Sequence, residues 1–599
     1  MIYTQNNLRF ANSPYLQQHK NNPIWWQEWG TEVLEYAVKS ERIVFASIGY
    51  ATCHWCHVMA KEAFSDKQVS GFLNSYFVSI KVDREQRPDI DQFAMAFINS
   101  LGRQGGWPLN IFFTPSLKPI VAFTYMPVGH RDETHGFLEV LHDIKKYYDK
   151  HGSAIEPFMY SRPTIAQVNE EQLAKKLSLL FDFEHGGFGD QEKFPPHCIV
   201  LFMLYYFEVN KDPLLKKMIS STLDTMLLSG LHDHLQGGFF RYCVDQTWTI
   251  PHFEKMLYDQ ALLLWEYSLA YGIFKNENYK RAAQKIIQCL EETFESDGLY
   301  YSGHDADTDH EEGATYTWSQ DEIASLLPLK EFLRFNEVYG VSKEGNFKGE
   351  NHLVKIANQN VAESERILLG ARKMRPQPFV DRKIITSWNC LAGIGFIHAY
   401  RYLKDDRLLA KARSIFSGLM DHNWRMGTMH HSSMDSNVLP GEYLQDCGAM
   451  LLFITYLHEE TGEFSKEMDA FYGKVKEYHG NDEWMESSQK DFLTVPAEPY
   501  DSPVPSGASM AELAMARADI LQGRQYDFTD FREPLLRDFF NISVLLRNGF
   551  FHCMKTPSKI DYNRLPGNTV QVRSHECVDC YLNVCIPKEE LCLEKTALM

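Results

Sequence analysis

The chain has 599 residues, 44% of them apolar and 23% charged, and its formal net charge is −19 at pH 7. This length exceeds what one hydrophobic core organises, so several domains are expected, and the composition is that of a globular protein. The excess of acidic residues argues against nucleic acid or an anionic membrane surface as the main partner.

Neither an export signal nor a membrane span is recognisable in the sequence. The first twenty residues lack the basic and apolar regions of a secretory signal, and no apolar run reaches the roughly 18 residues that cross a bilayer. Twelve cysteines in so long a chain do not form a disulfide framework, so most are expected to be reduced and buried. We therefore expect a cytoplasmic protein with no membrane partner.

The order of predicted elements at the N-terminus is that of a thioredoxin fold. Residues 42–50 (RIVFASIGY) form an apolar, β-rich stretch, and residues 57–77 carry apolar side chains at helical spacing. Further strands are expected at 77–85 and 105–115, the last opened by a Trp-Pro bond. We expect Pro108 to be a cis-proline beside a redox motif, although only about 5–6% of such bonds are cis.

Cys53 and Cys56 form a Cys-x-x-Cys motif at the start of the predicted helix. The positive end of a helix dipole lowers the pKa of a thiol there, so a redox pair is favoured. Cys53 is the predicted, more exposed nucleophile and Cys56 the resolving thiol, with His54 and His57 in support. Haem attachment, zinc binding and a purely structural pair are the alternatives, and the missing export signal makes haem the least expected.

The rest of the chain is predicted to be helical. The stretch HGSAIEPFMYSRPTI has no clean period, which places a linker at 156–167 after a first domain of residues 1–155. From 168 to 599, a glycine followed by aromatic or apolar residues recurs after helical runs about every 60 residues. Six or seven helical hairpins fit a closed (α/α)6 toroid, and the bare period also fits an open solenoid.

Polar side chains gather at the starts of the helices expected in the inner ring. These helices run parallel in a toroid, so their starts would meet at one mouth, and an aromatic and carboxylate lining there suits a sugar. Two carboxylates could hydrolyse a glycoside, or an acid and a base could epimerise a sugar, whereas each residue taken singly could instead cap a helix. The candidate pocket residues are Asp233, Arg241, His252, Glu254, Asp259, Asp305, Asp307, Asp381, Trp388, Asn389, Asp446 and Ser506.

The C-terminal segment is rich in cysteine. Cys577, Cys580, Cys585 and Cys592 come near a zinc-knuckle spacing without matching one, so buried free thiols are expected, with zinc or electron exchange with the first pair as alternatives. The acidic stretch DADTDHEEG (305–313) lacks the glycine and the final glutamate of a calcium loop at their required places. The sequence thus predicts no bound metal and no cofactor.

Long stretches on both sides of the linker resemble the spermatogenesis-associated thioredoxin-domain family and its bacterial relatives. The resemblance covers nearly the whole chain and implies a thioredoxin-like domain fused to a toroid similar to sugar 2-epimerases and six-hairpin glycosidases, without an established reaction. At 441–450 the sequence GEYLQDCGAM departs from the family pattern, although Asp446 is retained. The matching stretches are 13–30, 47–66, 78–91, 105–115, 186–195, 237–263, 305–318 and 386–394.

Three functions are carried forward from the sequence. In the first, the protein is a thiol–disulfide oxidoreductase in which Cys53 attacks a disulfide, Cys56 resolves it, and the toroid binds a protein disulfide client or a small carbohydrate-like ligand. In the second, the toroid is a sugar epimerase, isomerase or glycoside hydrolase, and the thioredoxin-like domain is accessory. The third is a ligand-binding protein without turnover.

Overall fold

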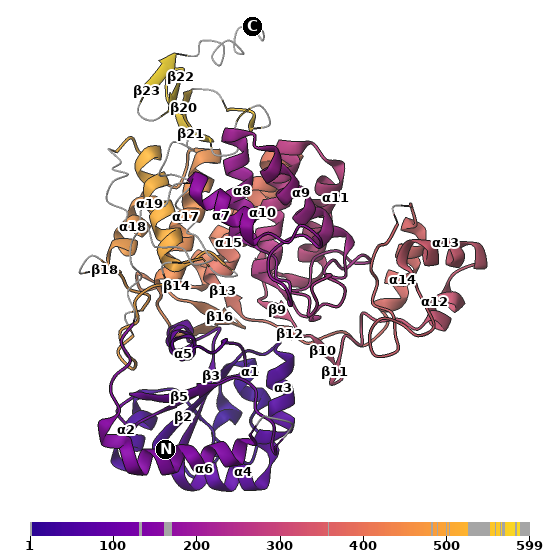
Figure 1. Cartoon of the computed structure of the whole chain (residues 1–599). Helices are drawn as coiled ribbons and strands as arrows, with labels where there is room; N and C mark the ends of the chain where they lie inside the picture. Colours follow the sequence, from indigo (N-terminus) through magenta and orange to yellow (C-terminus); the bar gives the residue numbers. More distant parts are fainter. Residues whose placement is uncertain are drawn as a thin grey trace.

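The structure is a computed structural model in which an α/β part, a helical part, a small helical lobe and a C-terminal sheet can be told apart (Figure 1). Among the helices of the described residues, none combines the length and the apolarity that a bilayer crossing needs. The described residues are 3–524 and 552–587, apart from 131–134, 161–169, 358, 436, 481–482, 488, 499, 502–503, 557–558, 563–564, 566–568 and 582–583.

The α/β part is built on a five-stranded sheet of order β1-β3-β2-β4-β5. The first three strands in this order are parallel, and β4 and β5 run antiparallel to their neighbours. This is the predicted thioredoxin fold, and the Trp107–Pro108 bond is cis as predicted. The strands are β1 Gln27–Glu28, β2 Ile43–Gly49, β3 Phe77–Asp83, β4 Leu109–Phe113 and β5 Pro119–Phe123.

Helices surround this sheet, and every residue of β2, β3 and β4 is buried. The single helix predicted over 57–77 is wrong, because the chain turns at 62–66 and a second helix starts after Asp66. The Asp66 carboxylate accepts hydrogen bonds from the amides of Gln68 and Val69, which makes it a helix N-cap. The helices are α1 Pro14–Gln18, α2 Thr31–Lys39, α3 His54–Lys61, α4 Lys67–Tyr76, α5 Pro88–Ser100 and α6 Phe137–His151.

The helical part alternates outer and inner helices. The inner helices α10, α15, α17 and α19 are buried nearly all round and pack in that order, as the sequence predicts for an inner ring, and α8 adjoins α10. The last predicted hairpin would fall on 525–551, outside the described residues. The helices are α7 Glu170–Leu180, α8 His197–Asn210, α9 Pro213–Leu228, α10 Leu257–Phe274, α11 Glu277–Cys289, α15 Thr386–Leu403, α16 Asp406–His422, α17 Leu444–Thr461, α18 Ser465–Lys476 and α19 Gly507–Leu521.

Two segments differ from the predicted helical repeat. The repeat unit at Gly345 belongs to the lobe beside the toroid, which has its own core and consists of α12 Gln320–Leu326, α13 Leu329–Tyr339 and α14 Ala362–Arg372 (Figure 1). At the opposite end from the α/β part, a four-stranded sheet replaces the expected helices. Its strands are β20 His552–Thr556, β21 Thr569–Arg573, β22 Val578–Tyr581 and β23 Val584–Pro587.

The C-terminal cysteines lie in or beside this sheet. Cys577 is bonded in a disulfide, so the expectation of a free thiol is wrong there. Cys580 lies in β22 and Cys585 in β23, whereas Cys592 lies outside the described residues. Elsewhere in the described chain the free cysteines Cys198, Cys243, Cys289, Cys390 and Cys447 are buried, and Cys553 is half-buried.

Candidate functional site

The Cys-x-x-Cys motif begins α3 and forms a disulfide between Cys53 and Cys56. Cys53 is the N-cap, and its Sγ accepts a hydrogen bond from the Cys56 amide at 3.2 Å. Cys53 is 3% exposed and Cys56 1%, so the expected difference in exposure is almost absent. The reason is that toroid segments pack over the N-terminus of α3.

Two histidines of the motif bind these toroid segments. His54 Nδ1 lies 2.7 Å from Asp307 Oδ1, and His57 Nε2 lies 3.1 Å from both oxygens of Asp305. Burial by itself lowers the pKa of His57, but the hydrogen bond and charge of Asp305, with the charge of Asp307, raise it above its ordinary value. Both histidines therefore hold α3 against the toroid, and their predicted support of thiol chemistry stays a prediction.

The residues just before the motif are bonded to the toroid mouth as well. Tyr50 and Thr52 donate their hydroxyl hydrogens to the two oxygens of Glu254, at 3.1 and 3.4 Å. The Arg241 guanidinium donates to Glu254 at 2.9 Å, to Tyr50 Oη at 2.5 Å and to Tyr258 Oη at 2.8 Å. Residues about 200 positions apart in the chain thus form one buried network beside the disulfide.

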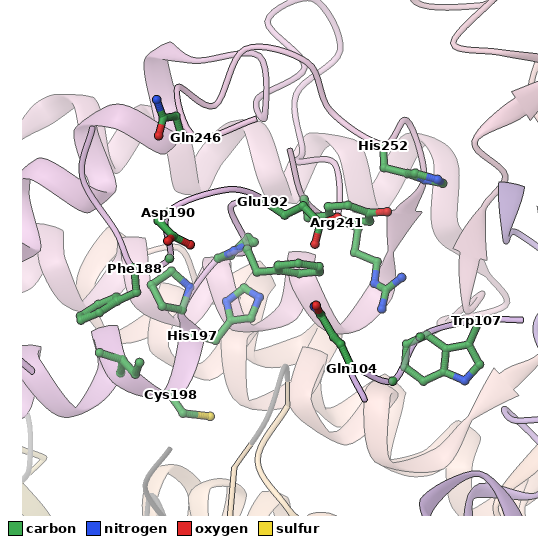
Figure 2. Close-up of a pocket in the computed structure, with 18 of the residues that line it drawn as sticks. Gln104, Trp107, Phe188, Asp190, Glu192, His197, Cys198, Arg241, Gln246 and His252 are labelled. Carbon is green, nitrogen blue, oxygen red and sulfur yellow. The ribbon is translucent and has the colours of Figure 1, made fainter. Parts of the chain in front are cut away.

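A cleft of about 1850 Å³ lies between the α/β part and the toroid, and Cys53 is in its lining. In Figure 2, Trp107 of the α/β part lies beside Arg241 of the toroid, whose guanidinium carbon is 5.5 Å from the centre of the indole ring. The same lining carries aromatic side chains from both parts. These are Tyr50, Trp55, Trp107, Tyr125, Phe188, Phe194 and Tyr242.

His197, at the start of α8, lines the cleft (Figure 2). Both of its ring nitrogens are bonded to buried carboxylates. Its Nδ1 lies 2.6 Å from Glu266 and its Nε2 3.0 Å from Asp259. Burial opposes a charge on this ring, but Glu266 and Asp259 raise the pKa of His197 to about 9. The imidazolium therefore persists at neutral pH as a buried cation between two anions.

His252 also lines the cleft, but its ring is neutral, in contrast to that of His197. Burial lowers the pKa of His252 to about 4, so the ring is neutral, and it stacks on Tyr242 with ring centres 5.1 Å apart. Its Nδ1 lies 3.6 Å from Glu254 Oε1 and has no hydrogen-bond partner among the described residues. A neutral imidazole with an unused nitrogen can accept a hydrogen bond from a ligand, or donate one, according to its tautomer.

Of the twelve toroid residues that the sequence singles out, three line this cleft: Arg241, His252 and Glu254. Asp307 and Asp305 bind the motif histidines His54 and His57, and Asp259 binds His197, which lines the cleft. Three of the twelve candidates are therefore part of the described cleft lining, and their predicted roles stay predictions.

The other six candidates make buried structural contacts. Asp233 pairs with Lys255 and Arg372, Asp446 with His431, and Asp381 with Lys383. Asn389 bonds the backbone of Tyr300 and Ile385, Ser506 caps α19, and Trp388 packs edge-on against Tyr258. Polar residues at helix starts satisfy free amides and buried charges here, which is the ordinary role of such positions.

Lys383 links the two parts of the protein through a buried charge cluster. Its Nζ lies 2.6 Å from Asp83, 2.8 Å from Glu85 and 3.2 Å from Asp381, and all four side chains are at most 2% exposed. Burial, opposed by Lys383, raises the pKa of Glu85 to about 7. Asp83 and Glu85 belong to the α/β part, so this cluster fixes the toroid against the end of β3.

Several lining residues were not found from the sequence, above all His197, Tyr50 and Tyr125. His197 could have been noticed as a histidine that opens an apolar helix after a Pro-Pro pair. The two tyrosines carry no sequence signal, because only the packing of the toroid against the α/β part brings them to the cleft.

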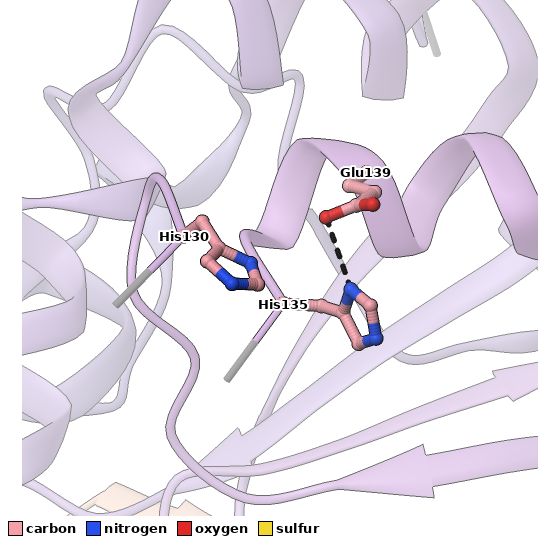
Figure 3. Close-up of side chains that lie close together, drawn as sticks. All are labelled: His130, His135 and Glu139. Carbon is pink, nitrogen blue, oxygen red and sulfur yellow. Dashed lines mark hydrogen bonds and ion pairs between the residues drawn. The ribbon is translucent and has the colours of Figure 1, made fainter. Parts of the chain in front are cut away.

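One group of potential metal ligands occurs in the described part of the chain. His130, His135 and Glu139 place ligand atoms within 4.8 Å of one another on the exposed surface at the start of α6 (Figure 3). His135 Nδ1 lies 3.1 Å from Glu139 Oε2 as an exposed pair four positions apart. None of the three lines the cleft.

Comparisons with known proteins agree with this architecture. The family model Thioredox_DsbH, described as a protein of unknown function (DUF255), matches residues 5–162. Uncharacterized protein B0495.5 of Caenorhabditis elegans is 32% identical over 596 residues, covering 87% of this chain and 81% of that protein. Spermatogenesis-associated protein 20 of Homo sapiens is 34% identical over 468 residues, covering 67% of this chain and 59% of that protein. The chain belongs to the spermatogenesis-associated thioredoxin-domain family.

Two solved structures whose names are those of a sugar isomerase and a sugar epimerase are similar to part of the chain at low identity. A D-mannose isomerase matches with 10% identity and a TM-score of 0.39, over 57% of this chain and 78% of that chain. A sugar epimerase from a ruminal bacterium matches with 14% identity and a TM-score of 0.30, over 59% of this chain and 96% of that chain.

Proposed function

We propose that the protein is a thiol–disulfide oxidoreductase whose substrate binds in the cleft between the thioredoxin-like domain and the toroid. The observation that carries this proposal is that Cys53 lines the same cleft as Arg241, Tyr242 and His252 of the toroid. A substrate sulfur that reaches Cys53 is therefore held by toroid side chains at the same time.

The exchange needs only the two thiols and the substrate. With the pair reduced, the Cys53 thiolate attacks one sulfur of a substrate disulfide, forms a mixed disulfide and releases the first substrate thiolate. The Cys56 thiolate then attacks Cys53 Sγ, releases the second substrate thiolate and closes the protein disulfide. The substrate is reduced by two electrons, the protein is oxidised by two, and the reverse sequence runs from the oxidised state.

The position of the pair supports this chemistry. Cys53 stands at the N-terminal end of α3, where backbone amides and the helix dipole favour a thiolate over a thiol. The amide of Cys56 already points at Cys53 Sγ, at 3.2 Å. The Glu254 and Arg241 network fixes the preceding residues, so the approach to Cys53 is defined by rigid neighbours.

The test is a trap of the mixed disulfide. In Cys56→Ser, Cys53 keeps its nucleophile but has no resolving partner, so adducts that form should persist on non-reducing gels and add a defined mass to the intact protein. Cys53→Ser is the matched control and should form none. Should Cys56→Ser form no adduct with any disulfide offered while remaining folded, the proposed function is wrong.

A second candidate is a carbohydrate-active enzyme that uses the toroid side of the cleft. It is favoured by the pair His252 and Glu254, a neutral imidazole 3.6 Å from a carboxylate, in a lining rich in aromatic side chains. Such a pair could move a proton on a sugar, and aromatic rings pack against sugar faces.

The second candidate function is tested with a variant that lacks both cysteines of the motif. Titration calorimetry of mono- and disaccharides on the double variant Cys53→Ser/Cys56→Ser should show binding that His252→Ala in the same background weakens. Binding with turnover in the absence of both thiols would favour the sugar enzyme over the oxidoreductase. If none of the sugars binds, the second candidate function is wrong.

A further inference from the structure

The charges of the cleft lining are strongly unequal. Among the described lining residues, six carry a carboxylate, and Arg241 is the one lysine or arginine. His252 adds no charge at neutral pH, since its pKa is lowered to about 4 by burial, whereas His197 is cationic. The carboxylates are Asp182, Glu184, Asp190, Glu192, Glu254 and Asp501.

Part of this negative charge is balanced inside the protein. Glu254 is paired with Arg241 at 2.9 Å, and Asp182 with the buried Lys193 at 2.7 Å. Asp190 and Glu192 are exposed and make no ion pair with any described residue, and Figure 2 shows both on the segment that precedes His197. The cleft therefore keeps an excess of negative charge on the lining segment between α7 and α8.

An unused polar atom points independently to a ligand. His252 is 4% exposed, lines the cleft, and leaves Nδ1 without a hydrogen-bond partner in the described part of the chain. A buried polar atom is normally satisfied, and in the Nε2–H tautomer Nδ1 and the Glu254 oxygen 3.6 Å away are both acceptors, which suits a donor from the ligand. An ammonium group has donors only.

Aromatic rings stand beside the disulfide. Trp55, between the two cysteines, is 45% exposed and lies 5.1 Å from the ring of Tyr125, and both line the cleft. Large exposed aromatic faces attract cations through the ring quadrupole. Cys53 itself is only 3% exposed, so a small molecule can approach it where a folded protein surface cannot.

We propose that the substrate of the Cys53–Cys56 pair is a small disulfide, or the matching thiol, that carries a positively charged amine. This inference rests on the proposed oxidoreductase function and adds the chemical class of its substrate. The amine is attracted to the toroid side of the cleft, where His252 Nδ1 lies beside Glu254 and where Asp190 and Glu192 add further negative charge, while the sulfur reaches Cys53 beside Trp55. Anionic disulfides are repelled by the same negative charge.

The experiment measures how fast three small disulfides oxidise the reduced full-length protein. The probes are cystamine (cationic), 2-hydroxyethyl disulfide (neutral) and 3,3′-dithiodipropionate (anionic), followed by stopped-flow tryptophan fluorescence because Trp55 adjoins the pair. Each rate is divided by the rate of the same disulfide with free dithiothreitol, which removes differences in intrinsic reactivity. At low salt the normalised rate should fall at least tenfold from cystamine to dithiodipropionate, the lower end of known electrostatic effects on encounter rates.

A charge variant locates the source of that preference. Asp190→Asn/Glu192→Gln should reduce the ratio of the cationic to the anionic rate by roughly threefold to tenfold. Glu337→Gln/Glu344→Gln, which removes two exposed charges on the lobe side, is the matched control and should leave the ratio unchanged. An equal fall in both variants would mean that the overall charge of −19, and not the cleft, sets the ratio, and the inference would be overturned.

The two proposals fail in different ways. If all three probes oxidise the pair with equal normalised rates, the substrate class is wrong and the oxidoreductase function stands. If none oxidises the pair faster than an unstructured dithiol peptide, and Cys56→Ser traps no adduct, the oxidoreductase function itself is wrong. A preference for the anionic probe would reverse the assignment of charge.

Discussion

Lys383 offers the sharpest test of how the two parts are held together. Its ammonium group is shared by Asp83, Glu85 and Asp381 at 2.6–3.2 Å, with no exposure of the lysine side chain. Lys383→Met keeps most of the volume and removes the only charge that offsets the three carboxylates within this cluster. Loss of one partner from a buried ion pair costs about 3–5 kcal/mol. We therefore expect Lys383→Met to lower the free energy of unfolding by about 4 kcal/mol at pH 8.

The loss should depend on pH in a defined direction. Burial already raises the pKa of Glu85 to about 7 and that of Asp381 above its ordinary value, so the folded state binds more protons than the unfolded state. The stability linked to such groups is fully present below their unfolded pKa and is lost as the pH rises through the folded pKa. Without Lys383 these pKa values rise further. One extra proton bound by the folded state changes the free energy of unfolding by about 1.4 kcal/mol per pH unit. The destabilisation by Lys383→Met should therefore be about 1–2 kcal/mol smaller at pH 5.5 than at pH 8.

Urea unfolding followed by tryptophan fluorescence measures this effect. With a slope of about 2 kcal/mol per molar urea, Lys383→Met should move the first midpoint down by about 2 M at pH 8 and by less at pH 5.5. Lys39→Met is the control, because Lys39 pairs with Glu35 on the surface and such pairs contribute about 0–1 kcal/mol. Equal shifts in the two variants, or a larger loss at pH 5.5, would refute the reasoning.

Two further predictions concern the surroundings of the disulfide. Asp305→Asn should lower the pKa of His57, because burial lowers this pKa and the carboxylate that raises it is removed. In a titration of ¹³C-labelled histidines, the curve assigned to His57 with the variant His57→Gln should move to lower pH. An unmoved curve would contradict the contact. Gly49→Ala should cost about 1–3 kcal/mol and alter the reduction rate of the pair, because a Cβ would lie 2.7 Å from Cys56 Sγ. Gly71→Ala, with open space around it in α4, should instead stabilise by about 0.5–1 kcal/mol, and urea midpoints compare the two.

The thioredoxin-like domain could be predicted from the sequence because its signals are local. Short apolar, β-rich runs that are buried along their whole length mark its central strands. Cys53 and Cys56 lie where a strand gives way to a helix, and Trp107–Pro108 precedes an apolar strand. The inner helices of the toroid were predicted for the same reason, since a helix buried on all sides is apolar all round. The break before α4 was missed, although Asp66 is a strong cap, because the apolar period continues through it.

The candidate site was decided by contacts between distant segments. Tyr50 reaches Glu254, His57 reaches Asp305, and these bonds bury a cysteine that the motif alone would leave exposed. In the segment between α9 and α10, a polar residue has the same sequence pattern whether it lines a cleft, as His252 does, or binds a buried cation, as Asp233 does. Sequence spacing fixes which residues share one helix or strand. Which charges meet across the two domains depends on how the toroid closes and docks, and that is a property of the packed chain alone.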